Sequence, residues 1–194
     1  MLNIINFFKF FLLFFTFHLM SCQRVEVLDS IVFDYDQLSK LTITAEELII
    51  NEIYEIKYSE PYIDHSLKIS PKSHLIYLLK NNISNIGSEN KLIINIHNAS
   101  LKKNEILNSD AKKFQEKNIL QYEINFLVEY ILLNDSNKIL SVTNVESKRS
   151  LTSGKFISIM EYEKIIDSLI LDGLVDFINK SKELINIHMS GYIL

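Results

Sequence analysis

The stretch QYEINFLVEYILL, residues 121–133, decides the fold because its side chains alternate in character over its whole length. Six apolar or aromatic residues recur at every second position: Tyr122, Ile124, Phe126, Val128, Tyr130 and Leu132. Glu123, Asn125 and Glu129 occupy positions between them. Successive side chains of a strand point to opposite faces, so this pattern predicts a strand with one face against the core and the other mostly in water.

The segments on either side extend this strand into a sheet. NDSNK, residues 134–138, has the composition of a hairpin loop, and ILSVTNVESKR, residues 139–149, is expected to return as an antiparallel partner. Upstream, KLIINIHNASL (91–101) predicts a further strand, followed by a lysine-rich polar loop over 102–118. LTITAEELIINEIYEIKY (41–58) is compatible with one long strand or a pair of strands, although its Ala-Glu-Glu centre could equally start a short helix.

Two helices are predicted. Ser70 is a suitable N-cap with Pro71 at the first helical position, and Gly87 is placed to close the C-terminus. The apolar face of this helix comprises Leu75, Leu78, Leu79, Ile83 and Ile86. A second helix is expected from about Ile159 to Ile187, with an apolar stripe of Tyr162, Ile166, Leu169, Gly173, Leu174, Phe177, Ile178 and Ile185. Its interspersed Asp167, Asp172, Asp176 and Lys180 are expected on the solvated face.

The element order strand, helix, strand, strand, strand, helix predicts an α+β fold. We expect an antiparallel sheet of about four strands with two helices packed on one face, following an N-terminal signal peptide. No internal repeat or domain boundary is evident. We expect a signal peptide over 1–21, an N-terminal segment and tether over 22–40, and a single α+β domain over 41–194.

The first 21 residues have the layout of a secretory signal. Lys9 is their one formal charge, and a run of Phe and Leu follows it. The run is shorter than the roughly 20 apolar residues that a spanning helix needs, although an uncleaved anchor over residues 2–20 remains an alternative. The run ends at Cys22, the single cysteine of the chain, which cannot form an intramolecular disulfide.

The sequence LMSC, residues 19–22, resembles the lipobox of bacterial lipoproteins. The resemblance implies cleavage before Cys22, a diacylglyceryl group on its sulfur and a further acyl chain such as palmitate on its amino group. Several acyl chains hold a domain firmly on a membrane, at about 0.8 kcal/mol per buried methylene. Gln23 after the cysteine implies, by the same resemblance, an outer-membrane location facing the periplasm. A free thiol after an ordinary signal peptide is the alternative.

The composition excludes some functional classes. The net charge of −4 argues against nucleic-acid binding, which normally requires a basic surface. GxSxG, HExxH and glycine-rich phosphate motifs are absent from the sequence, so we expect no enzyme, cofactor or metal. Asp64, His65, His74 and His97 could form a metal or acid–base site, but no ligand spacing supports one.

Two other groups of residues have a functional and a structural interpretation. The lysines Lys102, Lys103, Lys112, Lys113 and Lys117 are candidates for contact with anionic lipid or lipopolysaccharide, or form a solvated loop. Tyr54, Tyr58 and Tyr62, at four-residue spacing, form an interface patch or pack on the sheet.

EPYIDH (60–65), the strand ending INIHNASLKKNE and the closing helix are similar to an uncharacterised group of Gram-negative envelope lipoproteins. By element order the chain also resembles the lipopolysaccharide-assembly lipoprotein that plugs the outer-membrane export barrel and the auxiliary lipoproteins of lipid-transporting ABC systems. These resemblances imply a non-catalytic, membrane-anchored protein that binds a protein partner in outer-membrane assembly or in lipid or lipopolysaccharide transport. A periplasmic lipid-binding module with an apolar pocket is the second hypothesis, and a hydrolase with an unrecognised site is the third.

Overall fold

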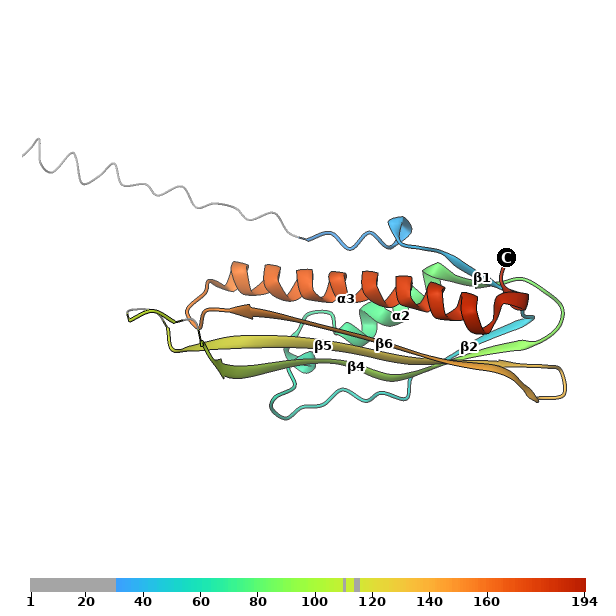
Figure 1. Cartoon of the computed structure of the whole chain (residues 1–194), viewed down its shortest axis with the longest axis horizontal. Helices are drawn as coiled ribbons and strands as arrows, with labels where there is room; N and C mark the ends of the chain where they lie inside the picture. Colours follow the sequence, from blue (N-terminus) through green and yellow to red (C-terminus); the bar gives the residue numbers. More distant parts are fainter. Residues whose placement is uncertain (1–30, 110, 114–115) are drawn as a thin grey trace, which may run out of the picture.

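The structure is a computed structural model that describes residues 31–109, 111–113 and 116–194. In this part of the chain, four strands form one sheet in the order β2-β4-β5-β6, and helices α2 and α3 cover one of its faces (Figure 1). The strands are β2 (Glu47–Asn51), β4 (Lys91–Leu107), β5 (Asn118–Leu133) and β6 (Ile139–Ser153). The expected α+β fold is confirmed.

One detail of the expected sheet is wrong: it is mixed rather than wholly antiparallel. Strands β4, β5 and β6 pair antiparallel, but β2 pairs with β4 in parallel. The connection from β2 to β4 passes through α2 (Pro71–Asn82). A crossover through a helix returns the chain to the same end of the sheet, and the next strand then runs parallel to the first.

The parallel pair brings together two copies of one tetrapeptide. LIIN occurs at 48–51 and again at 92–95, and the two copies pair residue for residue, from Leu48 beside Leu92 to Asn51 beside Asn95. Lys91 and Glu47, one position before each copy, form an ion pair of 2.7 Å. Equivalent side chains of the two strands therefore face the same side of the sheet.

The segment 41–58 forms a pair of short strands rather than one strand or a helix. β1 (Leu41–Ile43) pairs in parallel with β3 (Ile83–Asn85) in a separate two-stranded sheet, and β2 joins the large one. Ala45, fully buried, lies between β1 and β2. The Ala-Glu-Glu centre thus marks a change of sheet.

Helix α2 begins as predicted and ends earlier than predicted. The Ser70 side chain accepts a hydrogen bond from the backbone N–H of Ser73, with Pro71 as the first helical residue. The helix ends at Asn82, and Ile83 is already extended as the first residue of β3. Gly87 therefore does not close the helix, and Ile86 is 60% exposed rather than part of the apolar face. The β-branched Ile83 is well suited to a strand.

Helix α3 (Ile159–His188) matches the predicted range closely. Ser158 and Glu161 form a capping box at its start, in which each side chain binds the other residue's backbone N–H. Seven of the eight predicted stripe residues are buried, and Tyr162 is half-buried. Gly173 allows close approach to the sheet, because a Cβ there would lie 3.0 Å from Ile124 Cγ2 and 3.1 Å from Phe126 Cε2.

Strand β4 is longer than predicted. It continues to Leu107, with a register shift between Ile96 and Asn98 typical of a β-bulge. Lys102 and Lys103 consequently lie on the strand and not in a loop, which is a correction to the sequence analysis. The hairpin over 134–138 is confirmed, and Asn137 adopts a positive φ of 55° there.

The core lies between the sheet and the helices. Its centre comprises the predicted inward residues of β5, the buried leucines of α2, the buried apolar side chains of α3, and Leu92, Ile94 and Ile96 of β4, all at most 2% exposed. Packing against this core already begins at Phe33, Tyr35 and Leu38, upstream of β1.

Candidate functional site

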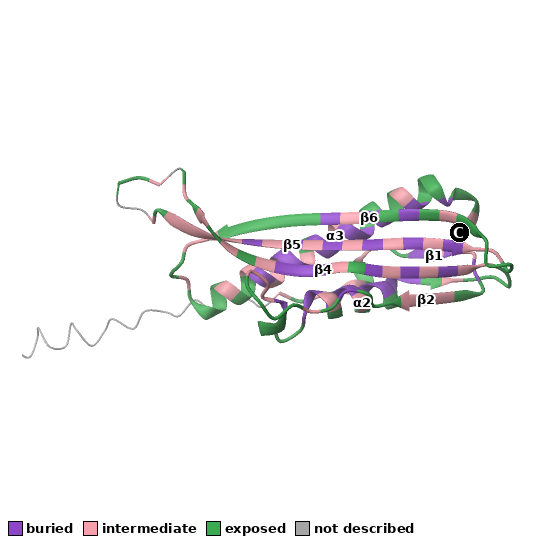
Figure 2. Cartoon of the chain, turned by 90° about the horizontal axis from the view of Figure 1, so that it is seen from below, coloured by how far each residue is buried: buried purple, intermediate pink, exposed green. Residues whose placement is uncertain are grey.

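The face of the sheet turned away from the helices carries an aliphatic row across all four strands. Figure 2 shows this face, with the strands in front of α2 and α3. Ile49 pairs with Ile93, Ile93 with Ile131, and Ile131 with Val142. Their sequence neighbours Leu92 and Leu132 are fully buried on the helix side, so the row points outward. Val142 is 41% exposed.

A polar row borders the aliphatic row one step further along the strands. Asn51 donates a hydrogen bond to Asn95 (2.9 Å), and Asn95 donates to Glu129 (2.9 Å). His97 Nε2 lies 3.2 Å from the same Glu129 carboxylate. The Asn95 amide first, and then His97, hold the pKa of Glu129 below its usual range. Asn144, exposed on β6, pairs with Glu129 and completes the row.

On the other side of the aliphatic row, the Glu47–Lys91 ion pair occupies β2 and β4. The aliphatic row is thus an apolar centre with polar groups on both sides, and this is the usual anatomy of a protein–protein interface. We call the four residues Ile49, Ile93, Ile131 and Val142 the aliphatic row below.

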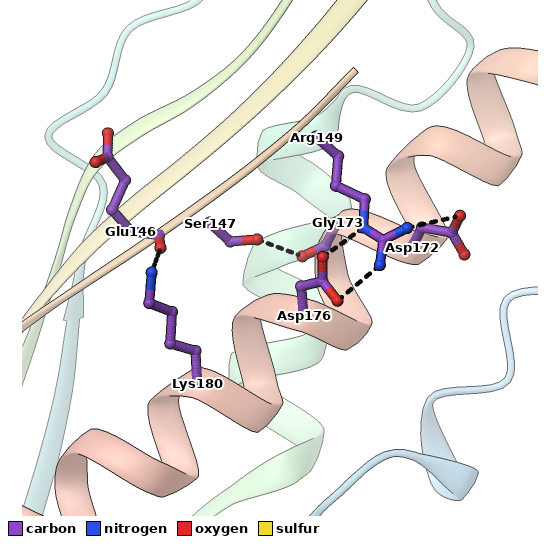
Figure 3. Close-up of polar contacts among 7 residues, drawn as sticks. All are labelled: Glu146, Ser147, Arg149, Asp172, Gly173, Asp176 and Lys180. Carbon is purple, nitrogen blue, oxygen red and sulfur yellow. Dashed lines mark hydrogen bonds and ion pairs between the residues drawn. The ribbon is translucent and has the colours of Figure 1, made fainter. Parts of the chain in front are cut away.

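Polar side chains fix the edge strand β6 to α3 (Figure 3). Arg149 points from β6 toward two carboxylates of α3: it forms a bidentate pair with Asp176 and a further contact of 3.5 Å with Asp172. The paired Asp176 raises the pKa of Arg149. These aspartates lie on the solvated face of α3 as expected, since their side chains are 50% (Asp172) and 39% (Asp176) exposed, and they also bind Arg149.

Two backbone carbonyls take part in the same contact. Lys180 Nζ donates to the carbonyl of Glu146 in β6 (2.7 Å), and Ser147 Oγ donates to the carbonyl of Gly173 in α3 (3.2 Å). A lysine on an edge-strand carbonyl removes an acceptor that a foreign strand could use. The β6 edge is therefore partly blocked at its centre, whereas in the aliphatic row Val142 is exposed and Ile49, Ile93 and Ile131 are partly exposed.

The EPYIDH segment has a structural role at Asp64. Asp64 is 1% exposed and accepts hydrogen bonds from Tyr54 Oη (2.5 Å) and from the backbone N–H of Leu101 (2.7 Å). Burial and the Asp64 contact raise the pKa of Tyr54 far above its usual value. Residues 54–64 are thereby held along β4 beyond the end of β2, where Tyr62 forms an isolated bridge with Lys102.

The structure does not bring the candidate acid–base residues together. Asp64 is buried, but its neighbour His65 is exposed and contacts the backbone carbonyl of Lys57 (3.1 Å). His97 lies on the outer face of the sheet beside Glu129. His74 is buried against the ring of Phe33 and lies 2.5 Å from Tyr35 Oη. Among the described residues, no group of three or more His, Cys, Asp or Glu could hold a metal ion.

A cavity of about 480 Å³ lies between the N-terminal segment and the first turns of α3. Its apolar lining includes Ile31, Phe33, Ile69 and Ile159, and its polar lining includes His74 and Asp167. Burial, with a smaller effect of Glu163, raises the pKa of Asp167. Burial lowers the pKa of His74. This cavity opens at the side of the helices and not between the helices and the sheet.

The three tyrosines have different environments. Tyr54 is buried, Tyr58 is 79% exposed, and Tyr62 is half-buried between two lysines. Lys57 Nζ donates to Tyr62 Oη (3.0 Å), and this bond lowers the pKa of Tyr62. Lys57 and Lys102 lie 4.3 and 5.3 Å from the centre of the Tyr62 ring. The four-residue spacing therefore does not produce one patch.

The five candidate lysines lie in two different places, on strand β4 and in the connection that follows it. Lys102 and Lys103 are adjacent on β4, so their side chains point to opposite faces of the sheet. Lys112, Lys113 and Lys117 lie in the connection between β4 and β5 and are exposed.

Cys22, the expected lipidation site, lies outside the described residues. Within 31–109, 111–113 and 116–194, we find no helix with the length and apolar character needed to cross a membrane.

The sequence analysis missed the aliphatic row. A signal for it exists: the apolar runs around Ile49, Ile93 and Ile131 are continuous, and a continuous run places apolar side chains on both faces of a strand.

No family model matches the chain, and no curated protein matches it. Solved structures with a similar overall arrangement include a minor lipoprotein from Acinetobacter baumannii (8% identity, TM-score 0.40, covering 77% of this chain and 96% of that one). Another is a putative neuraminyllactose-binding hemagglutinin homolog from Helicobacter pylori (12% identity, TM-score 0.44, covering 84% of this chain and 96% of that one). A third is rare lipoprotein B from Shewanella oneidensis (13% identity, TM-score 0.33, covering 73% of this chain and 97% of that one).

Proposed function

We propose that this chain is a non-catalytic, lipid-anchored envelope protein that binds a protein partner through the aliphatic row. The lipid is attached at Cys22, and the domain faces the periplasm from the outer membrane. The partner belongs to outer-membrane assembly or to lipid or lipopolysaccharide transport. The anchor confines the domain near partners in the same membrane, so that modest affinity suffices.

The observation that carries the proposal is the position of the aliphatic row on the helix-free face. Four aliphatic side chains in direct cross-strand register form a continuous apolar surface. Asn95 and Glu129 on one side, and Lys91 on the other, provide a hydrogen-bonding rim. An apolar centre with a polar rim fits a folded protein surface better than an acyl chain, which needs enclosure on several sides.

The lipid-carrier alternative has less support. It requires an apolar cavity between the helices and the sheet, and Leu78, Ile94 and Leu174 at that interface are all fully buried. The side cavity of about 480 Å³ includes Ser66, Lys68, Glu163 and Asp167 in its lining, so it is not a purely apolar tunnel.

The hydrolase alternative is weaker still. His97 pairs with Glu129 at the surface, and within the part of the chain that the structure describes its ring forms no hydrogen bond with a serine or threonine hydroxyl. Ester, peptide or glycan turnover that His65→Ala or His97→Ala abolishes would establish this alternative and contradict a non-catalytic function.

Two lysine substitutions test the proposed surface. Val142 points outward from β6 in the aliphatic row, whereas Asn81 is exposed on α2, on the helix side of the sheet. We expect affinity purification of the full-length protein from membranes to enrich one defined partner with the wild type and with Asn81→Lys. Val142→Lys should lose that partner because it places a charge in the apolar centre. Equal recovery with both variants would contradict the proposed surface.

The anchor has an independent test. Metabolic labelling with a clickable fatty acid should tag the wild type and not Cys22→Ala, because the cysteine sulfur receives the diacylglyceryl group. Equal labelling of the two proteins would contradict the anchor.

We also propose that Lys112, Lys113 and Lys117 make a secondary contact with anionic head groups. Lys102 and Lys103 point to opposite faces of the sheet, so each could contribute to such a contact only on its own face.

A further inference from the structure

The end of the molecule at which α3 begins carries a second, separate group of exposed apolar side chains. Phe156 is 91% exposed, Ile159 79%, Ile69 51% and Met160 40%. Ile69 and Ile159 both line the side cavity, so the segment before α2 and the start of α3 are adjacent there. We call these four residues the apolar tip.

The apolar tip is held in place by polar contacts. The backbone N–H of Lys155 donates to Glu116 (2.9 Å), and Lys155 Nζ pairs with Glu105 of β4 (2.5 Å). Two residues after Phe156, the capping box of Ser158 and Glu161 fixes the first turn of α3. Phe156 lies between these two fixed points, so its exposure is a feature of the folded structure rather than fraying of a helix end.

The chain upstream leads to the same end. Ile31, the first described residue, lines the side cavity together with Ile159 and Ile166. Eight residues lie between Cys22 and Ile31, so nine Cα–Cα steps of roughly 3.3–3.6 Å can span at most about 30 Å. Acyl chains on Cys22 would therefore hold the bilayer surface within about 30 Å of Ile31.

We propose that the apolar tip inserts into the lipid surface to which Cys22 is anchored. This inference rests on the proposed lipid anchor. Exposed Phe, Ile and Met side chains at an interface bury their apolar surface among the acyl chains. The local charges are largely engaged, because Lys155 pairs with Glu105 and Glu161 caps α3. Insertion of these four side chains is therefore apolar, and high salt should leave it intact even where it weakens the secondary lysine contact.

The contact also orients the domain. Helix α3 has 30 residues and is about 45 Å long. Its far end, the β5–β6 hairpin and the short strand β2 lie together at the other end of the molecule (Figure 1). Insertion of the apolar tip thus holds the aliphatic row away from the bilayer, where the periplasmic part of a partner in the same membrane can reach it.

The chain contains no tryptophan, so a single substitution gives an unambiguous fluorescent reporter. Phe156→Trp places the reporter in the apolar tip. Ile139→Trp, at a residue 64% exposed beside the hairpin, is the matched control. Both full-length, lipidated proteins are reconstituted into vesicles of phosphatidylethanolamine and phosphatidylglycerol, with and without phospholipid brominated on its acyl chains.

We expect a blue shift and strong quenching by brominated lipid for Phe156→Trp, and a solvent-like spectrum without quenching for Ile139→Trp. If both proteins float with the vesicles and neither is quenched, the anchor stands and insertion of the apolar tip is contradicted. A blue shift without quenching would mean that protein covers the tip, and it would also contradict insertion. If the proteins do not float with vesicles, or if Cys22→Ala floats equally well, the anchor itself fails and the inference fails with it.

Discussion

Tyr54 donates a hydrogen bond of 2.5 Å to the buried carboxylate of Asp64. Asp64 also accepts from the backbone N–H of Leu101, so one carboxylate joins an irregular segment to strand β4. A buried carboxylate is costly unless it is hydrogen-bonded. The pair therefore explains how a segment without regular secondary structure follows the edge of the sheet.

We expect Tyr54→Phe to lower the free energy of unfolding by about 1–3 kcal/mol, because it leaves the buried Asp64 carboxylate with one donor fewer. Tyr58→Phe, at a residue 79% exposed, is the control and should change stability by less than about 0.5 kcal/mol. Urea denaturation of both variants measures the difference. Equal stabilities would show that the Tyr54 hydroxyl contributes nothing to the fold.

Gly173 tests how closely α3 packs on the sheet. We expect Gly173→Ala to destabilise the domain by about 1–2 kcal/mol despite the better helix propensity of Ala, because the new methyl group meets the fully buried Ile124 and Phe126. Gly191→Ala has no atom within 4 Å of its new Cβ and should be nearly neutral. Thermal unfolding compares the two, and a stabilised Gly173→Ala would contradict the packing described.

His74 predicts a dependence of stability on pH. Burial lowers the pKa of His74 below its ordinary value of 6.5 in the folded state, so the unfolded chain binds the proton first as pH falls. The His74 contribution is complete above pH 6.5 and is lost as pH falls from there toward the lowered pKa. Asp167 lines the same cavity, but its carboxyl group is present both in the wild type and in a variant changed only at His74, so the difference between the two reports on His74.

His74→Asn keeps a polar atom near Tyr35 Oη without a titrating ring. Between about pH 7 and about pH 5.5, we expect the wild type to lose more stability than His74→Asn. Chemical denaturation across this range is the measurement. Parallel pH profiles for the two proteins would show that His74 is not the titrating group.

Helices and strands whose apolar residues repeat regularly could be predicted from the sequence. The strands with which they pair could be predicted less well. Residues 121–133 and the α3 stripe alternate or repeat clearly, and both lie as expected. The direction of β2 could not be predicted, because the three-residue apolar run over 48–50 has no directional signal. Ile83 fits the apolar period of α2 and also suits a strand, and pairing with Leu41 decides in favour of the strand.

The candidate site was harder to predict for a related reason. Ile93 and Ile131 occupy opposing positions because of the register of β4 and β5, and register is a tertiary property. Asp64 and Tyr54 are ten residues apart in an irregular segment, so no period connects them. The extension of β4 places Lys102 and Lys103 on opposite faces of the sheet, and contact of the lysines with anionic lipid stays a prediction.

Site-specific photo-crosslinking in intact cells tests the central claim most directly. A photoreactive amino acid at Val142 lies in the aliphatic row, and the same group at Tyr77, which is 57% exposed on α2, is the control on the helix side. We predict one discrete adduct between this protein and a different envelope protein from Val142, and none from Tyr77. No adduct from Val142, the same adduct from both positions, or an adduct of two copies of this chain would contradict partner binding through the helix-free face.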